Sequence, residues 1–246
     1  MKFATWNLAR PVPSSRRRHA LIADQIIRVA ADIWVLTETH ASITPGSGFG
    51  SASTTGTDRP GDPDERWATI WSRFPIEPLS LTSDPVRAVA VRIVPPTGAP
   101  LIVYATVLPW LGSPWRHFPG AGGKAFAEAL QAQALDWRAL RESNLDHDLI
   151  VAGDFNQDLA ETHYYGSRAN RHGLRLALEG AGLVALTADG NDPVRRGSPP
   201  YACVDHICIS TSARWQARGL RRWPDVPKPD RHLSDHFGID VEFRAG

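Results

Sequence analysis

Five short polar clusters, each adjoining a hydrophobic run, contain the residues of this sequence whose types and spacing can do chemistry. They are Asn7 in ATWNL, Glu38 in WVLTETH, Asp154 and Asn156 in VAGDFNQ, Asp205 in VDHICIS, and the run Ser234-Asp235-His236. A carboxylate or an amide at the end of a strand is often only a turn former or a helix cap, so one cluster alone means little. The five together, in this order, indicate a divalent-metal phosphoesterase site.

The metal that suits these residues is Mg²⁺, with Mn²⁺ as the alternative. Mg²⁺ takes oxygen ligands in a near-octahedral shell and keeps several waters, so one or two carboxylates and a neutral oxygen are enough. Asn7, Glu38 and Asp235 can supply these oxygens. The sequence has no Cys/His cluster with zinc spacing, which disfavours a thiolate metal site.

The remaining polar residues fit the attack of water on a phosphorus centre. We expect Asp154 to orient or deprotonate the water, while Asn156 donates to the negative charge that develops. His236 needs a carboxylate that fixes its tautomer and favours its charged form, and Asp205 and Asp154 are the candidates. Asp205 lies in an otherwise apolar run, so it needs a partner if it is buried.

The elements that must position these residues follow from hydrophobic patterning. Apolar runs predict strands over 2–8, 32–38, 67–72, 86–93, 101–108, 148–156, 183–187, 204–210, 214–219 and 236–243. Helical patterns cover 15–32, 122–143 and roughly 169–180. A strand, helix and strand ending in polar residues occur twice, which indicates two similar halves. Strands outnumber helices, so we predict an α/β fold of two packed sheets covered by helices, in one domain over residues 1–246.

Three segments between these elements read as loops. Residues 41–66 are rich in Gly, Ser, Thr, Pro and Asp, which predicts a long surface loop or a mobile flap. Residues 108–123 and the Pro-rich run 221–232 are the others, and the second leads directly into the Ser-Asp-His run. We expect these loops to decide the substrate.

The net charge and the cysteine content indicate which partners and which cellular compartment are to be expected. The formal net charge is +1, so the total does not indicate a nucleic-acid binder, a membrane-surface protein or an acidic tail. Cys203 and Cys208 are an odd number of residues apart on a predicted strand, so they face opposite sides and cannot pair. With no disulfide framework, leader or long apolar stretch, we expect a cytoplasmic protein with no membrane segment and no obligate protein partner.

From Asn7 to His236, the motifs resemble those of the endonuclease/exonuclease/phosphatase superfamily. The most specific pieces are GDFN at 153–156 and SDH at 234–236. The resemblance implies a four-layer α/β/β/α sandwich, with two mixed sheets face to face and the site at one end. It also implies that Asn7 and Glu38 stand at the metal end of the site.

The same resemblance assigns the other residues. Asp154 and Asn156 match the family's GDxN pair, and Asp205 matches the Asp that orients the last His. Asp235 then lies near the metal, and His236 contacts the scissile phosphate. Water activated around Asp154 and His236 attacks from the side opposite the leaving oxygen.

One position departs from the family pattern. Many members have a His, and the abasic-site group a Tyr, where this chain has Val107 in YATVLPW. That group normally assists the phosphate or the leaving group, so its absence bears on the rate and the substrate. Trp110, Trp115, His117 and His163 are the nearby residues that can take its place.

Three functions remain open for this site. The first is a Mg²⁺-dependent phosphodiester hydrolase, a nuclease acting on DNA or RNA; the second is hydrolysis of a small phosphomonoester, or of a phospholipid or inositol-phosphate headgroup, by the same residues. The third, motivated only by Val107, is a catalytically weakened binding protein. Candidate substrate contacts are Trp110, His163, Arg222, Trp223 and Arg231. For these we weigh nucleotide stacking and pairing against ordinary loop positions.

Overall fold

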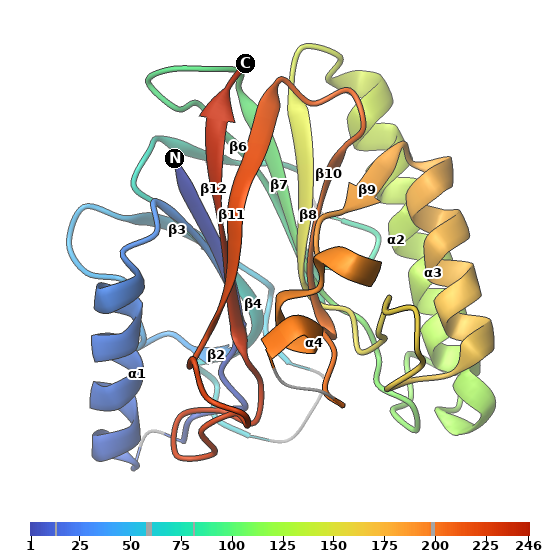
Figure 1. Ribbon diagram of the computed structural model, residues 1–246, viewed down its shortest axis with the longest axis horizontal. Coiled ribbons are helices and arrows are strands. Elements are labelled where there is room, and N and C mark those ends of the chain that lie inside the picture. Colours follow the sequence, from blue (N-terminus) through green and yellow to red (C-terminus); the bar gives the residue numbers. More distant parts are fainter. Residues whose placement is uncertain (13, 58–60, 81, 198–199) are drawn as a thin grey trace.

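A computed structural model describes residues 1–12, 14–57, 61–80, 82–197 and 200–246. Two six-stranded sheets lie face to face, with helices on both outer sides (Figure 1). The predicted four-layer α/β/β/α sandwich is therefore confirmed. Within the described segments, no helix combines the length and the apolar character that crossing a bilayer requires.

The first sheet has the strand order β11-β12-β1-β2-β4-β3. Its strands are β1 (Lys2–Asn7), β2 (Ile33–His40), β3 (Gly50–Ser53), β4 (Glu65–Ser72), β11 (Trp215–Trp223) and β12 (Gly238–Ala245). Strands β1 and β2 are parallel, and helix α1 (Arg16–Val29) connects them. Ile22 and Ile26 of α1 are buried against Trp6 and Trp34, which covers the outer face of this sheet. The helix ends where Ala30 takes a left-handed conformation.

The second sheet has the order β5-β6-β7-β8-β10-β9. Its strands are β5 (Ile76–Pro78), β6 (Ala88–Ile93), β7 (Leu101–Val107), β8 (Asp148–Asp154), β9 (Leu183–Ala185) and β10 (Asp205–Ser210). The other helical segments are α2 (Lys124–Ser143), α3 (Arg168–Gly180), α4 (Pro193–Gly197), η1 (Ala121–Gly123) and η2 (Asp189–Asn191). Helix α2 connects the parallel pair β7 and β8, and it packs with α3 on the outer face (Figure 1).

The two halves repeat the same connection, as the sequence predicts. In each half, two parallel strands flank a helix, and an antiparallel strand follows beside the second of them: β4 beside β2, and β10 beside β8. Two expectations about loops are wrong. Strand β3 lies inside the segment 41–66, and β11 continues through Arg221 and Arg222 to Trp223. The expectation of one domain over residues 1–246 stays a prediction.

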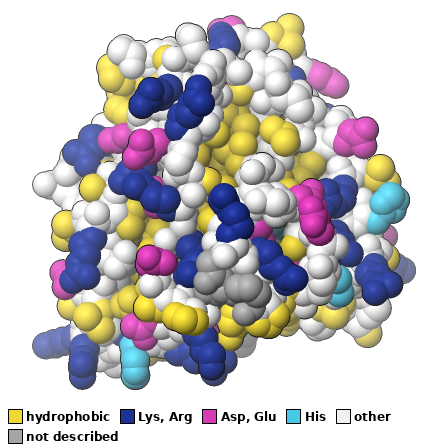
Figure 2. Space-filling view, viewed as in Figure 1, with side chains coloured by type: hydrophobic (Ala, Val, Ile, Leu, Met, Phe, Trp, Pro, Cys, Tyr) yellow, Lys and Arg dark blue, Asp and Glu magenta, His cyan; other side chains and the backbone are white. Residues whose placement is uncertain are grey.

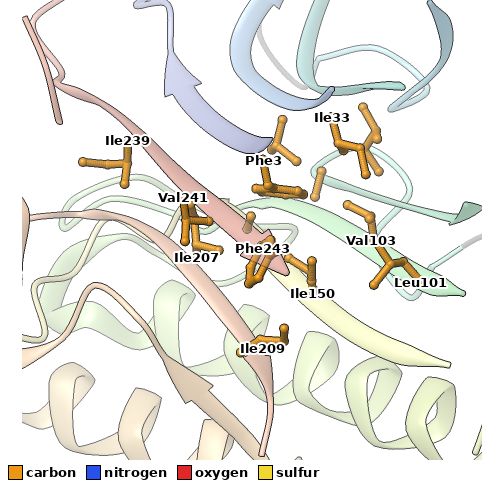
Figure 3. Close-up of a cluster of buried hydrophobic side chains, with 14 of the residues drawn as sticks. Phe3, Ile33, Leu101, Val103, Ile150, Ile207, Ile209, Ile239, Val241 and Phe243 are labelled. Atoms are coloured by element: carbon orange, nitrogen blue, oxygen red, sulfur yellow. The ribbon is translucent and has the colours of Figure 1, made fainter. Parts of the chain in front are cut away.

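The main hydrophobic core fills the space between the two sheets (Figure 3). Phe3, Val241 and Phe243 from the first sheet meet Val103 and Ile150 from the second, and all are buried. Each such side chain contributes about 1.5–3 kcal/mol through burial. Cys208 lies on β10 and packs toward the helix layer, whereas Cys203 lies before β10 begins and packs into this core. The expectation that both cysteines lie on one strand is therefore wrong, although the two do face different clusters. Both cysteines are free.

Strand register brings the polar clusters to one end of the sandwich. Val107 and Asp205 both lie opposite Asp154 in the second sheet. In the first sheet, β1 ends at Asn7 on the side where β12 begins at Gly238. These strand ends all lie at the lower end of the view in Figure 1.

Gly153 allows a test of how closely the backbones of β7 and β8 approach each other at the site end of the sheet. Its φ is +133°, and an added Cβ would collide with the carbonyl oxygen of Thr106 on β7. We expect Gly153→Ala to lower the free energy of unfolding by about 2 kcal/mol or more. Gly180→Ala is the matched control, because a Cβ there meets no atom within 4 Å. Urea unfolding measures both variants, and equal stability of the two would contradict the close approach.

Candidate active site

The carboxylate of Asp154 lies at the centre of the site. Asp154 ends β8 and is only 1% exposed. Its Oδ2 accepts hydrogen bonds of 2.9 Å from Nδ2 of Asn7 and 2.9 Å from Nδ2 of Asn156. Its Oδ1 accepts a 2.8 Å bond from the backbone N–H of Asn156. The carboxylate is thus fixed by amides from both sheets.

Asn156 is placed to hold Asp154 rather than to reach a substrate. Its backbone is left-handed, with a φ of 48°. Besides the bond to Asp154, its Nδ2 donates 2.9 Å to the carbonyl oxygen of Leu108. Both amide hydrogens are therefore used within the protein, and the expected donation from Asn156 to developing charge does not agree with this geometry. The sequence could not show this, because Leu108 belongs to another strand end.

His236 has Asp205, not Asp154, as its direct partner. Its Nδ1 donates 2.6 Å to Oδ2 of Asp205, the first residue of β10. The His236 backbone N–H donates 3.0 Å to Oγ of Ser234, and that hydroxyl donates 2.6 Å to the carbonyl oxygen of Asn7. These bonds fix the ring against the end of β1. The side chain is 20% exposed, so the ring stays accessible.

Burial and close charges shift the acid–base behaviour of this group. Burial, and then the charge of Asp205, raise the pKa of Asp154 to about 8, although His236 opposes the rise. Burial lowers the pKa of His236, but the charge and hydrogen bond of Asp205 and the charges of Asp154 and Asp235 raise it to about 10. At neutral pH the imidazole is therefore charged, while Asp154 is poised to exchange a proton.

Oxygen atoms suited to a hard cation gather beside this network. Glu38, near the end of β2, has a left-handed backbone with φ of 44°, and its charge acts on both Asp154 and Arg10. Asp235 has a 61% exposed side chain whose Oδ1 lies 4.0 Å from Nε2 of His236. Oδ1 of Asp205 is buried and has no hydrogen-bond partner among the described residues. Carboxylate and amide oxygens are the ligands that Mg²⁺ prefers, so the donor chemistry fits this ion.

A second carboxylate and imidazole group, absent from the sequence-based hypothesis, lies at the end of β2, whose last residue is His40. His40, Asp62 and Asp64 bring possible ligand atoms within 4.8 Å of one another. The backbone N–H of Ser42 donates to Nδ1 of His40, so the neutral ring has its proton on Nε2. That nitrogen lies 3.4 Å from Oδ1 of Asp62. A direct contact between the imidazole and the carboxylate is enough to account for this proximity, so the group does not by itself indicate a metal site.

Two of the expected substrate contacts on β11 are held within the protein. Trp223 is 6% exposed and packs edge to face against Trp6 and Trp34, so it belongs to the core. Arg222 donates to the carbonyl oxygens of Pro224 and Val226. These internal contacts do not support the sequence-based role of the two residues in nucleotide binding, which stays a prediction.

The other three candidates lie in loops. Trp110 packs against the ring of Trp67, with ring centroids 6.4 Å apart. Nδ1 of His163 lies 3.1 Å from Oδ2 of the fully buried Asp158. Arg231 is exposed in the turn that precedes Ser234. None of the three lines the cavity beside His236 described next.

A cavity of about 260 Å³ beside His236 and Asp205 is lined by residues that the sequence-based reasoning missed. They include Tyr164, Tyr165 and Tyr201. Burial, and then the charge of Asp154, raise the pKa of Tyr165, so this side chain lies within electrostatic reach of the central carboxylate. The signal in the sequence was the aromatic pair in THYYG, which begins eight residues after the end of the GDFN motif.

Comparison with protein families supports the motif reading. The sequence profile described as the Endonuclease/Exonuclease/phosphatase family matches residues 4–236. A comparison with curated protein sequences gives no significant match.

Solved structures share the fold at low identity. An endonuclease/exonuclease/phosphatase from Beutenbergia cavernae is 19% identical, with a TM-score of 0.65 over 100% of this chain and 72% of that chain. A 3′-5′ exonuclease from Neisseria meningitidis is 19% identical, with a TM-score of 0.64 over 99% of both chains. A mannosyl-6-phosphatase from Bacteroides thetaiotaomicron is 18% identical, with a TM-score of 0.65 over 99% of both chains.

The charge state of His236 can be measured directly. In metal-free protein, we expect NMR titration to show a charged His236 ring at pH 8, consistent with a pKa of about 10. Asp205→Asn removes the charge that raises this pKa, so burial dominates and the pKa falls.

His206 is the internal reference for this titration. Its Nε2 donates to the carbonyl oxygen of Gln157, and burial lowers its pKa, so its ring stays neutral. A neutral His236 at pH 8 would contradict the pairing with Asp205.

Proposed function

Since the chain belongs to the endonuclease/exonuclease/phosphatase family, we propose that it is a Mg²⁺-dependent phosphodiester hydrolase, a nuclease acting on DNA or RNA. Membership makes it a hydrolase of phosphoester bonds; the nucleic-acid substrate and the metal are our proposal. The observation that carries it is the buried Asn7–Asp154–Asn156 network directly beside the Asp205–His236 pair.

Asn7, Glu38 and Asp235 would hold the metal. Mg²⁺ would polarise the phosphate and steady the leaving oxygen. The donor set is made of oxygens, as this ion requires. His236 is a poor candidate ligand, because Asp205 occupies its Nδ1 and the ring remains charged at neutral pH.

Asp154 acts as the general base in this scheme. Burial raises its pKa to about 8, so its ionised form, which is the one that accepts a proton from water, increases as the pH rises from neutral through 8. Asn7 and Asn156 fix its orientation. His236, held by Asp205, offers a charged N–H to the phosphate oxygens as negative charge develops.

Two alternatives remain. Hydrolysis of a small phosphomonoester or a phospholipid or inositol-phosphate headgroup is supported by the near-neutral formal charge of +1 and by the mixed charges on the face shown in Figure 2. On the face in Figure 2, Lys and Arg side chains are scattered among Asp and Glu. A weakened binding protein is disfavoured, because the acidic residues and His236 required for turnover are all present. The buried, free cysteines support a cytoplasmic location.

The first test is cleavage of a supercoiled plasmid and a labelled single strand. We expect cleavage with Mg²⁺ that EDTA abolishes. Asp154→Asn should lower the rate roughly 10²- to 10⁴-fold through loss of the base, and His236→Ala roughly 10²- to 10³-fold. His147→Ala is the control, because His147 pairs with the exposed Asp146 just before β8, at the end opposite the site. A folded protein that binds Mg²⁺ but cleaves neither substrate would exclude the nuclease.

Salt dependence separates the polyanion from a small substrate. Binding of a nucleic acid releases counterions, so its affinity should fall linearly on a log–log plot as salt rises. A small phosphomonoester should respond much less. Measuring KM for a single strand and for mannose 6-phosphate between low and physiological salt makes the comparison, and a flat response for the strand would favour the small-substrate alternative.

A further inference from the structure

The cavity beside His236 and Asp205 is bounded by a continuous row of aromatic rings. Tyr201 packs edge to face against Tyr164, with ring centroids 5.8 Å apart, and against Phe237 at 6.2 Å. Phe237 directly follows His236, so the row ends at the group expected to contact the phosphate. The hydrolytic scheme itself does not require these rings.

The loop that carries two of the rings is fixed from beneath by Asp158. This carboxylate is fully buried and accepts hydrogen bonds from the backbone N–H groups of Tyr164, at 3.1 Å, and Tyr165, at 2.9 Å. Nδ1 of His163 lies 3.1 Å from Oδ2 of Asp158, and Nε2 of Gln157 donates 2.8 Å to the carbonyl oxygen of Tyr165. The tyrosines are therefore positioned before a ligand arrives, which lowers the entropic cost of binding.

The chemistry of the cavity selects the kind of group it can hold. No Lys or Arg is among the described residues that line it, and the charged His236 is already assigned to the scissile phosphate, so a second phosphate, as on an inositol polyphosphate, would meet no further cation there. Its volume of about 260 Å³ lies near the lower end of ligand pockets, which suits one ring system. Tyrosine rings stack on the faces of nucleobases without strong sequence preference.

We propose that this cavity binds one unpaired nucleobase next to the scissile phosphate, so that single-stranded or frayed nucleic acid is the substrate class. The inference rests on the proposed nuclease function. A base within an intact duplex is paired and stacked and must be extruded before it can enter such a pocket. Intact duplex is therefore cleaved more slowly than the same strand alone.

The test removes each partner of the proposed contact in turn: the base from the oligonucleotide and the tyrosine ring from the protein. A set of single-stranded oligonucleotides, each lacking one base near the cleaved bond, is compared between wild type and Tyr201→Ala. On the intact strand, Tyr201→Ala is expected to lower kcat/KM roughly 5- to 100-fold through lost stacking. On the strand that lacks the bound base, the same substitution has little effect, because the contact is already gone.

Three further variants keep the test decisive. Tyr201→Phe retains the ring and is expected to retain the single-strand preference. Tyr164→Ala repeats the test if circular dichroism shows that Tyr201→Ala is unfolded. Leu145→Ala removes an exposed apolar side chain outside the cavity and is expected to behave as wild type.

The outcomes separate the pocket from the nuclease. Equal losses on all oligonucleotides, or faster wild-type cleavage of duplex than of single strand, would overturn the pocket and leave the nuclease standing. Failure of the wild type to cleave any oligonucleotide, with hydrolysis of mannose 6-phosphate, would instead overturn the nuclease on which the pocket rests.

Discussion

The buried carboxylate of Asp154 is the constraint on which the rest of the structure depends. A carboxylate removed from water is costly unless hydrogen bonds compensate it. Here the compensation comes from Asn7 at the end of β1 and from Asn156 just beyond β8. Because Asn7 belongs to the first sheet and Asp154 to the second, their 2.9 Å bond fixes the sheets relative to each other at the site end. Loss of either partner would leave a buried polar group unpaired.

The same carboxylate determines the electrostatics of its neighbours. Strand register places Asp205 opposite Asp154, so two acidic groups lie close together in a buried setting. Their repulsion is relieved by the charged ring of His236, which is hydrogen-bonded to Asp205. Burial, and then the charge of Asp205, raise the pKa of Asp154, whereas the charge and hydrogen bond of Asp205 raise the pKa of His236 against the effect of burial. Catalytic acid–base groups and fold register cannot be varied independently here.

The sequence predicts the strands and the meeting of the polar clusters well, because both follow from local patterning. Apolar runs identify the strands, and polar residues at the ends of adjacent strands must converge. The role of Asn156 could not be predicted, since it depends on the carbonyl oxygen of Leu108, which only the folded chain brings near. The packing of Trp223 could not be predicted either, because a Pro-rich neighbourhood resembles a loop, whereas its core position depends on Trp6 and Trp34 from other strands.

One short segment carries both the proposed general base and the carboxylate that supports the proposed nucleobase-binding loop. In GDFNQD, Asp154 is buried among the groups that we propose to be catalytic, and Asp158, four residues later, is buried beneath the loop of Tyr164 and Tyr165. The chain between them makes hydrogen bonds at Asn156 and Gln157, so no flexible linker separates the base from the ring platform. A misplacement of about 1 Å between reacting groups can cost roughly 100-fold in rate. Anchoring both functions on adjacent buried carboxylates keeps a bound ring in fixed register with the attacked phosphate.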